Sequence, residues 1–267
     1  MSTKQNNYLQ QGFTLVELAI VLIVIGIIIG GITVGTGLIR QSKLNSIITD
    51  ARNYEAAYVN FMNRYLKAPG DLDYANTLWT SNCTVASVSC SGNGNGLIDA
   101  SASGIDESWL AWKHLDLSGF LNQGMVLVPS TTSSTVPVIS QNVPAGKIDG
   151  TGYMMSVGSD TVIGSGGATH PSGLWNDSRT NAVFIAKTAA NNKLTGGSIT
   201  SEDAFTLDKK FDDASVDTSG NYNGAKTGGI RTFEDIAASP AKSCLTATTT
   251  YAVPATTISC VLGVALN

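Results

Sequence analysis

Residues 12–40 read GFTLVELAIVLIVIGIIIGGITVGTGLIR, and the rest of the chain is organised around them. The 22 residues from Leu18 to Ile39 carry no charge, and at about 1.5 Å of rise per residue they would form about 33 Å of helix. That length matches the hydrocarbon core of a bilayer. Glu17 is the one charge inside the apolar run, and an ionisable group there is costly unless it is paired. The stretch predicts a membrane-compatible helix with one functional carboxylate.

A polar leader, MSTKQNNYLQQG, precedes this helix. A secretory signal peptide would place a small-residue cleavage site after its apolar run, but here the run continues into more helix without one. The leader ends at Gly12, directly before Phe13 and the string TLVEL.

The Gly12–Phe13 junction, the Thr-Leu pair, Glu17 and the long apolar run resemble the signature of type IV pilins and type II secretion pseudopilins. The resemblance implies that a prepilin peptidase cuts after Gly12 and N-methylates Phe13, which becomes the first residue. Glu17 then falls where the family has its glutamate. An ordinary single-pass anchor is the alternative, and it leaves Glu17 unexplained.

The same resemblance implies a filament subunit that packs through its N-terminal helix against copies of itself or related pilins. It implies insertion in the bacterial inner membrane, with the C-terminal domain in the periplasm, and then extraction by an inner-membrane assembly platform into a filament. In that bundle the Phe13 amine would pair with Glu17 of a neighbour and set the axial register. Two roles stay open, a pilus subunit and a pseudopilin of a type II secretion system. A membrane-anchored surface-binding module is the competing class.

Beyond Arg40 the helix is expected to become amphipathic and to end at Pro69-Gly70. Apolar residues recur there at spacings of three and four, which predicts one buried face: Leu44, Ile47, Ala51, Tyr54, Tyr58, Phe61 and Tyr65. The expected division is a leader at 1–12, a transmembrane and assembly helix at 13–39, an amphipathic half at 40–68 and a β-rich globular domain at 69–267.

The globular domain is rich in Gly, Ser, Thr and Asn and poor in charge. Short apolar runs of strand length alternate with turns: MVLV, TVPVI, GYMMSVG, AVFIAK and TISCVLGVAL. We therefore expect an α+β fold in which an antiparallel sheet packs on the apolar face of the long helix. Residues 107–115 predict a short helix with Trp109 and Trp112 on one face, and residues 164–180 predict a surface loop.

The four cysteines form two close pairs, Cys83 with Cys90 and Cys244 with Cys260. Their even number and spacing predict two short disulfide loops and an oxidising compartment. Buried free thiols are the alternative.

Two stretches imitate calcium loops. Residues 91–99 alternate Asn or Asp with Gly, but the glutamate that ends an EF-hand loop is missing, which favours a turn. Asp208, Asp212, Asp213 and Asp217 could together supply hard oxygen ligands for Ca²⁺. The alternative is a polar turn in which these side chains cap backbone N–H groups and pair with nearby lysines.

No other chemistry is indicated. The chain has no G-x-S-x-G, P-loop or G-x-G-x-x-G motif, and its two histidines, His114 and His170, lack a carboxylate cluster beside them in the sequence. His114 lies on an aromatic helix face and is expected to be structural. The net charge of −4 gives no sign of nucleic-acid binding. We expect a structural protein rather than an enzyme.

Overall fold

The computed structural model describes residues 13–85, 88–99, 107–126, 138–157, 180–188, 194–225, 227–234, 244–247, 250–254 and 258–266. The chain separates into two compact units, Met1–Lys43 and Leu44–Asn267. The expected leader with Gly12, most of the expected loop at 164–180, half of the run MVLV and most of the run TVPVI lie outside the described residues.

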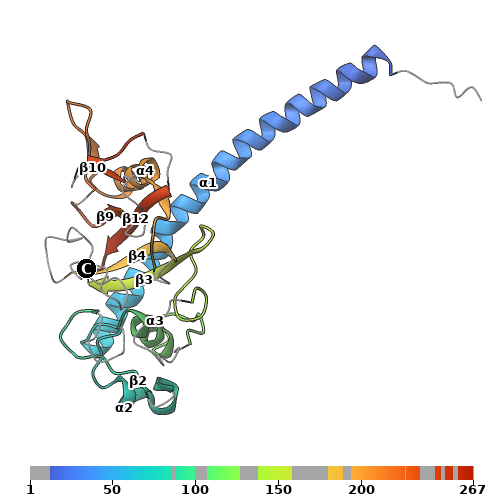
Figure 1. The fold of residues 1–267 in the computed structure, drawn as a ribbon. Coiled ribbons are helices and arrows are strands. Elements are labelled where there is room, and N and C mark those ends of the chain that lie inside the picture. The colour runs from blue at the N-terminus through green and yellow to red at the C-terminus, as the bar shows by residue number, and fades with distance from the viewer. Residues whose placement is uncertain are drawn as a thin grey trace, which may run out of the picture. The chain divides into compact units, whose positions relative to one another are not determined.

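A single long helix, α1, spans Leu15–Tyr65 (Figure 1). It contains no proline, so every turn can keep its backbone hydrogen bonds. Its end comes three residues before the position expected from the sequence. Leu66 adopts a left-handed φ of 56° while its N–H still bonds the Met62 carbonyl at 2.8 Å. The helix therefore closes with a left-handed residue, and Pro69 lies shortly beyond it.

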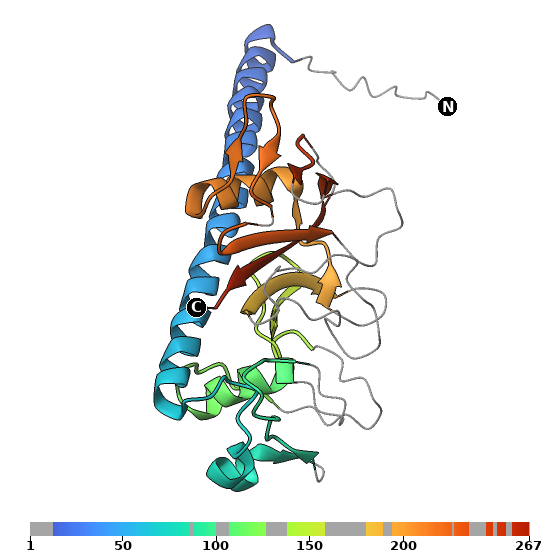
Figure 2. The same ribbon diagram turned by 90° about the vertical axis from the view of Figure 1, so that its left-hand side faces the viewer.

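The part of α1 that belongs to the second unit buries one face, as the spacing of its apolar residues predicts. The buried side chains are Leu44, Ile47, Ile48, Ala51, Tyr54, Ala57, Tyr58 and Phe61. Tyr65, the last residue of the expected face, is only half-buried. Figure 2 shows this part of α1 running beside the strands of the second unit.

The core of the second unit is a six-stranded antiparallel sheet in the order β3-β4-β12-β6, with β5 paired to β4 and β9 paired to β12. Its strands are β3 (Thr151–Val157), β4 (Asn181–Thr188), β5 (Leu194–Gly196), β6 (Ile199–Thr200), β9 (Ile230–Glu234) and β12 (Ile258–Ala265). Every residue of β3 is buried, so both faces of this strand are covered. The expected α+β fold is confirmed.

Polar contacts join α1 to this sheet inside the core. The Tyr153 hydroxyl on β3 donates to Asp50 at 3.1 Å, and the Asn181 amide on β4 donates to the Tyr58 hydroxyl at 3.0 Å. Asn181 also accepts from the N–H of Ile98 at 2.9 Å. Each of these polar groups has a hydrogen-bond partner, so burying it costs little free energy. The bonds therefore fix the position of the helix along the strands.

Smaller elements complete the second unit. Two more helices are α2 (Ala75–Trp79) and α4 (Ser201–Phe211), and a short 3₁₀ turn covers Thr80–Cys83. A two-stranded sheet pairs β1 (Thr84–Val85) with β2 (Val88–Ser89). A four-stranded sheet has the order β10-β11-β8-β7, with β7 (Ser215–Val216), β8 (Tyr222–Asn223), β10 (Leu245–Ala247) and β11 (Thr250–Tyr251).

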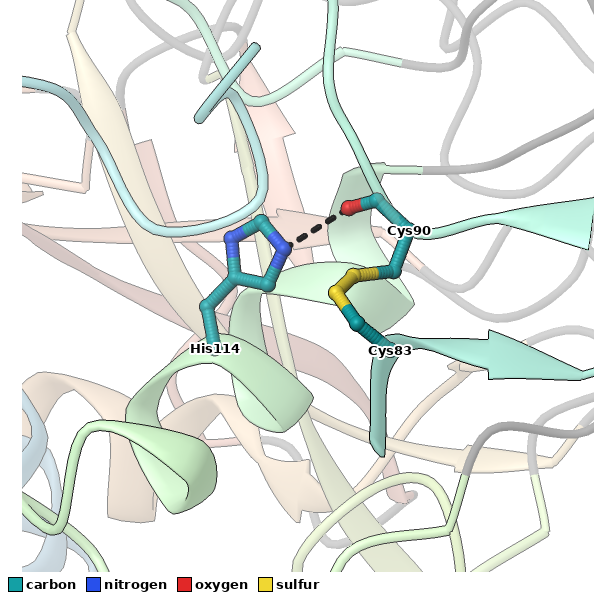
Figure 3. A group of neighbouring side chains, drawn as sticks. All are labelled: Cys83, Cys90 and His114. Carbon is teal, nitrogen blue, oxygen red and sulfur yellow. Dashed lines mark hydrogen bonds between the residues drawn. A yellow bond between two sulfur atoms is a disulfide. The ribbon is translucent and has the colours of Figure 1, made fainter. Parts of the chain in front are cut away.

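Helix α3 (Glu107–Leu117) buries Trp109, Trp112 and His114, in agreement with the expected aromatic face. His114 connects two loops: the Gly70 N–H donates to His114 Nδ1 at 2.9 Å. Its Nε2 lies 2.8 Å from the Cys90 carbonyl oxygen (Figure 3). Only a neutral ring with its proton on Nε2 can make both bonds. Burial lowers the pKa of His114 to about 4.

The neutral state of His114 makes stability depend on pH. An unfolded chain protonates this ring near pH 6.5, whereas the folded chain does so only near pH 4. The contribution of the neutral His114 to the free energy of unfolding is therefore complete above about pH 6.5 and is lost as the pH falls through about 4. Between pH 7 and pH 5 the advantage of the wild type over His114→Gln should shrink by up to about 2 kcal/mol.

Denaturant unfolding of the two proteins at both pH values measures this difference. His170 is present in both proteins, so its effect on the free energy of unfolding cancels in the difference between them. A gap that stays constant with pH would contradict a neutral buried His114.

Candidate assembly site and acidic cluster

The N-terminus of α1 is closed by a reciprocal pair of side chains. The Thr14 N–H and the Thr14 hydroxyl both donate to Glu17 Oε2 at 2.8 Å, and the Glu17 N–H bonds Thr14 Oγ1 at 3.2 Å. This is a capping box, in which the first and fourth residues of a T-x-x-E string satisfy each other's backbone donors. Our sequence reasoning missed this role of Glu17, although the string TLVE at 14–17 carries the pattern.

The helix that follows exposes its apolar side chains. Phe13 is 92% exposed, and the large apolar residues from Leu15 to Ile39 are all exposed as well. Among the described residues, α1 is the one helix long and apolar enough to cross a membrane. An isolated soluble chain would not leave such a surface in water. The segment therefore requires an apolar environment, either lipid or other helices.

The chain matches the family model of the prokaryotic N-terminal methylation motif over residues 8–33. This motif is the type IV pilin and pseudopilin signature, and its span includes the Gly12–Phe13 junction and Glu17. No curated protein and no solved structure matches the chain. The motif and the apolar helix together support a pilin-like, membrane-anchored single-pass protein.

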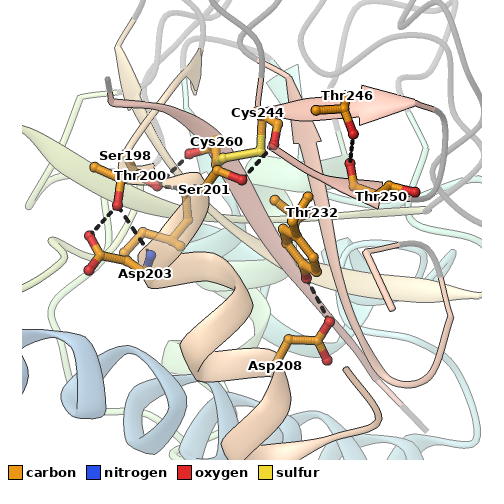
Figure 4. Close-up of a disulfide and its surroundings, with 12 residues drawn as sticks. Ser198, Thr200, Ser201, Asp203, Asp208, Thr232, Cys244, Thr246, Thr250 and Cys260 are labelled. Carbon is orange, nitrogen blue, oxygen red and sulfur yellow. Dashed lines mark hydrogen bonds between the residues drawn. A yellow bond between two sulfur atoms is a disulfide. The ribbon is translucent and has the colours of Figure 1, made fainter. Parts of the chain in front are cut away.

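The cysteines form disulfides within the two close pairs. Cys83 is bonded to Cys90 next to His114 (Figure 3), and these three residues lie close enough to be considered a metal site. The disulfide removes both thiolates, so the group has no metal-binding sulfur. Cys244 is bonded to Cys260 and fastens the start of β10 to β12 (Figure 4).

The stretch at 91–99 forms a turn held by its own side chains. The amides of Asn93 and Asn95 donate to the two carboxylate oxygens of Asp99 at 3.1 and 2.8 Å. Each asparagine also accepts a backbone N–H two residues further on, at Asn95 and Leu97. Because amide donors face Asp99, this arrangement favours the Asx-turn interpretation over a cation loop.

Helix α3 holds this turn through a buried carboxylate. The two oxygens of Glu107 accept from the N–H groups of Asn93 at 2.7 Å and Asp99 at 3.1 Å. Burial is the main cause that raises the pKa of Glu107 to about 8, and the charges of Asp99 and Asp71 raise it further. At neutral pH Glu107 is thus largely protonated.

A second group of acids gathers at the C-terminal end of α4. One carboxylate oxygen each of Asp208, Asp212 and Asp213 lies within 4.8 Å of the others. Asp208 is fully buried, whereas Asp212 and Asp213 are exposed. Asp208 Oδ2 accepts from the Tyr251 hydroxyl at 2.6 Å, while Asp208 Oδ1 is buried and has no hydrogen-bond partner. Burial, with smaller contributions from Asp212 and Asp213, raises the pKa of Asp208 to about 7.

The fourth predicted ligand, Asp217, is used elsewhere. Its Oδ1 accepts from the N–H groups of Ser219 and Asn221 at 2.9 Å, and its Oδ2 accepts from the amides of Asn221 at 2.9 Å and Asn223 at 3.1 Å. These bonds to the charged form lower the pKa of Asp217 to about 2. Asp217 therefore builds the β7–β8 turn, as the polar-turn alternative predicts, and Asn221 serves the same turn.

The titration of Glu107 gives a second pH test. In the folded chain the Glu107 carboxyl group stays protonated up to about pH 8. In an unfolded chain it loses its proton near the ordinary glutamate pKa of about 4.3. The contribution of Glu107 is therefore complete in acid and is lost as the pH rises through about 8. Glu107→Gln removes one acceptor, so it should destabilise the chain most near pH 5 and progressively less towards pH 8.

Denaturant unfolding across this range measures the trend. The exposed Glu202 provides the control substitution, Glu202→Gln, which removes a carboxylate from the surface instead of from the core. A loss of stability in Glu107→Gln that grows towards pH 8 would reverse the predicted sign.

Proposed function

We propose that this chain is the structural subunit of a type IV pilus-like filament. A peptidase would cut after Gly12 and N-methylate Phe13, and the mature chain would assemble through α1. The methylation motif at residues 8–33 carries the proposal, and the exposed apolar surface of the helix supports it because other helices can cover that surface in a filament. The globular domain would first lie in the periplasm and then on the outside of the filament.

Glu17 would act between subunits in this filament. After cleavage the chain begins with the cationic amine of Phe13, about 6 Å along the helix axis from Glu17. In an apolar bundle each of these charges requires a partner, and an amine from a staggered neighbour would provide one. Before assembly, the capping box with Thr14 satisfies the same carboxylate.

The capping role and the assembly role can be separated by mutation. Glu17→Gln retains a capping box, since glutamine serves as well as glutamate at this position, but it removes the charge. Thr14→Ala removes the cap, at a cost of about 1 kcal/mol to the helix, but keeps the charge. We expect Glu17→Gln to reduce the recovery of sheared filaments about tenfold or more and Thr14→Ala to leave most of it.

Intact-mass analysis of both variants should still find a chain that begins with N-methylated Phe13, which shows that processing is unaffected. Wild-type recovery with Glu17→Gln would overturn the assembly role of the charge. An unprocessed mass for the wild-type chain would overturn cleavage after Gly12.

A type II secretion pseudopilin carries the same signature and is the alternative within this class. Filaments on the cell surface, labelled by an antibody against the globular domain, support the pilus subunit. Label confined to the cell envelope, together with the loss of a secreted protein on deletion of the gene, would support the pseudopilin. Label that stays with the membrane and no secretion defect would support an anchored binding module.

A further inference from the structure

The turn at residues 91–99 contains two asparagines that share the same local sequence. Asn93 and Asn95 are each preceded and followed by a glycine, and both are exposed. Asparagine is most prone to deamidation when glycine follows it, because no side chain then hinders the attack of the glycine nitrogen on the asparagine side chain. The asparagine Cγ lies four bonds from that nitrogen, so the attack closes a five-membered succinimide ring. By local sequence alone the two sites are equal.

The side chains of the two asparagines are also held alike. Each amide donates to one oxygen of Asp99, and each Oδ1 accepts a backbone N–H two residues further on. The N–H group that bonds Asn95 Oδ1 belongs to Leu97, at 2.8 Å. A donor in this position stabilises the negative charge that develops on Oδ1 when Cγ is attacked. These contacts favour the reaction at both asparagines and do not distinguish them.

The two sites differ in the group that meets the attacking nitrogen. The Gly94 N–H donates to the backbone carbonyl of Asp71 at 3.2 Å, whereas the Gly96 N–H donates to the carboxylate oxygen Oδ2 of Asp71 at 2.8 Å. A backbone carbonyl is a very weak base, but a carboxylate can accept the proton that the amide loses as it attacks. Of the two asparagines, Asn95 is therefore the one followed by a nitrogen with a base at its proton.

The surroundings of Asp71 strengthen it as a base. The residue is fully buried, and its second oxygen, Oδ1, has no hydrogen-bond partner. Burial is the main cause that raises the pKa of Asp71, and the backbone N–H groups around it, that of Gly96 first, oppose the rise. A raised pKa makes a carboxylate a better proton acceptor. The carboxylate that meets the Gly96 N–H is thus more basic than an aspartate in water.

Further contacts hold the turn against the segment that contains Asp71. The Gly92 N–H donates to the Leu72 carbonyl at 3.0 Å, and a Cβ on Gly92 would lie 2.5 Å from the Asp71 Cα, so the two backbones touch. Gly96 has a φ of +90°, a conformation that glycine adopts without strain. The fold therefore fixes the Gly96 nitrogen beside the Asp71 carboxylate.

We propose that Asn95 is a site of self-catalysed deamidation, with Asp71 as the general base. The bond between the Gly96 nitrogen and Asn95 Cγ forms, and the bond between Cγ and Nδ2 breaks. The Gly96 proton passes to Asp71 and from there to solvent, while solvent protonates the departing amide nitrogen, which leaves as ammonia. Water then opens the succinimide to an aspartate or isoaspartate at position 95. Water is the one co-reactant, and no redox change occurs.

The modification would replace an amide donor by a carboxylate inside the turn. Asn95 Nδ2 donates to Asp99 Oδ2 at 2.8 Å, so the new charge would face a second carboxylate and repel it. Glu107 on α3 bonds the same turn at the N–H groups of Asn93 and Asp99. A weakened turn would thus loosen the contacts at the start of α3. The folded chain would therefore change slowly with age.

The full-length chain in detergent micelles, incubated at neutral pH in water labelled with oxygen-18, is the material for the test. Each deamidation takes up one labelled oxygen, and fragment masses of the peptide that contains both asparagines assign it to Asn93 or Asn95. Because general-base catalysis acts at one site only, we expect Asn95 to react about tenfold faster than Asn93 or more. In the same chain unfolded in guanidinium chloride, the two rates should become equal.

Asp71→Asn is the main variant, because its amide oxygen can still accept from the Gly96 N–H but cannot take the proton. We expect the rate at Asn95 to fall to that at Asn93. Asp73→Asn is the matched control, since it removes an exposed carboxylate from the same segment and should leave the ratio of the two rates unchanged. Thermal melts of both variants show whether they fold. If Asp71→Asn does not fold, the folded and unfolded wild type supply the comparison.

Three outcomes would overturn the proposal. The first is an equal rate at Asn93 and Asn95 in the folded wild type. The second is a faster rate at Asn95 that persists in guanidinium chloride, and the third is a folded Asp71→Asn in which Asn95 still reacts as fast as in the wild type. Neither filament recovery nor processing at Gly12 enters these measurements, so the filament proposal is judged separately.

Discussion

Burial of one face of α1 against the antiparallel sheet is the constraint on which the second unit depends. Tyr54 lies at its centre, with its ring 4.9 Å from Trp112 on α3 and 5.0 Å from Tyr153 on β3. Aromatic groups in such edge-to-face contacts add specific geometry to the hydrophobic energy of the core. Asp50 and Tyr58 then bond Tyr153 and Asn181 at fixed positions along the helix. The helix thereby sets where the strands and α3 can lie.

The chain treats its carboxylates in three different ways, according to their surroundings. Glu17 is exposed and closes its own helix through Thr14. Glu107 is buried among backbone N–H groups, and its raised pKa keeps it largely neutral. Asp208 is buried beside two further acids and retains an oxygen without a partner. Asp71 is buried as well, and one of its oxygens likewise lacks a hydrogen-bond partner.

Much of the fold could be predicted from residue patterns. The three- and four-residue spacing from Leu44 to Phe61 identified the buried face of α1, and the apolar runs at 152–158 and 182–187 became β3 and β4. The segment around Asp208 was missed as a helix, because its charges obscured the apolar Ala204, Phe205 and Leu207 that α4 buries. The end of α1 was placed too late, since Leu66 is an unusual residue for a left-handed conformation.

The sequence by itself indicated the methylation motif and the long apolar helix at the N-terminus. The Gly12–Phe13 junction, Glu17 and the apolar run follow one another in the chain, so they can be recognised without any tertiary contact. The sequence also determined the two short disulfide loops, whose partners are close in the chain. Only the tertiary structure decided which acids act together. Asp217 is near Asp213 in sequence but caps its own turn, whereas Tyr251 reaches Asp208 from a distant strand. Contacts between segments that are far apart in the sequence depend on how the sheets and α4 pack. No local sequence pattern shows which of these residues meet.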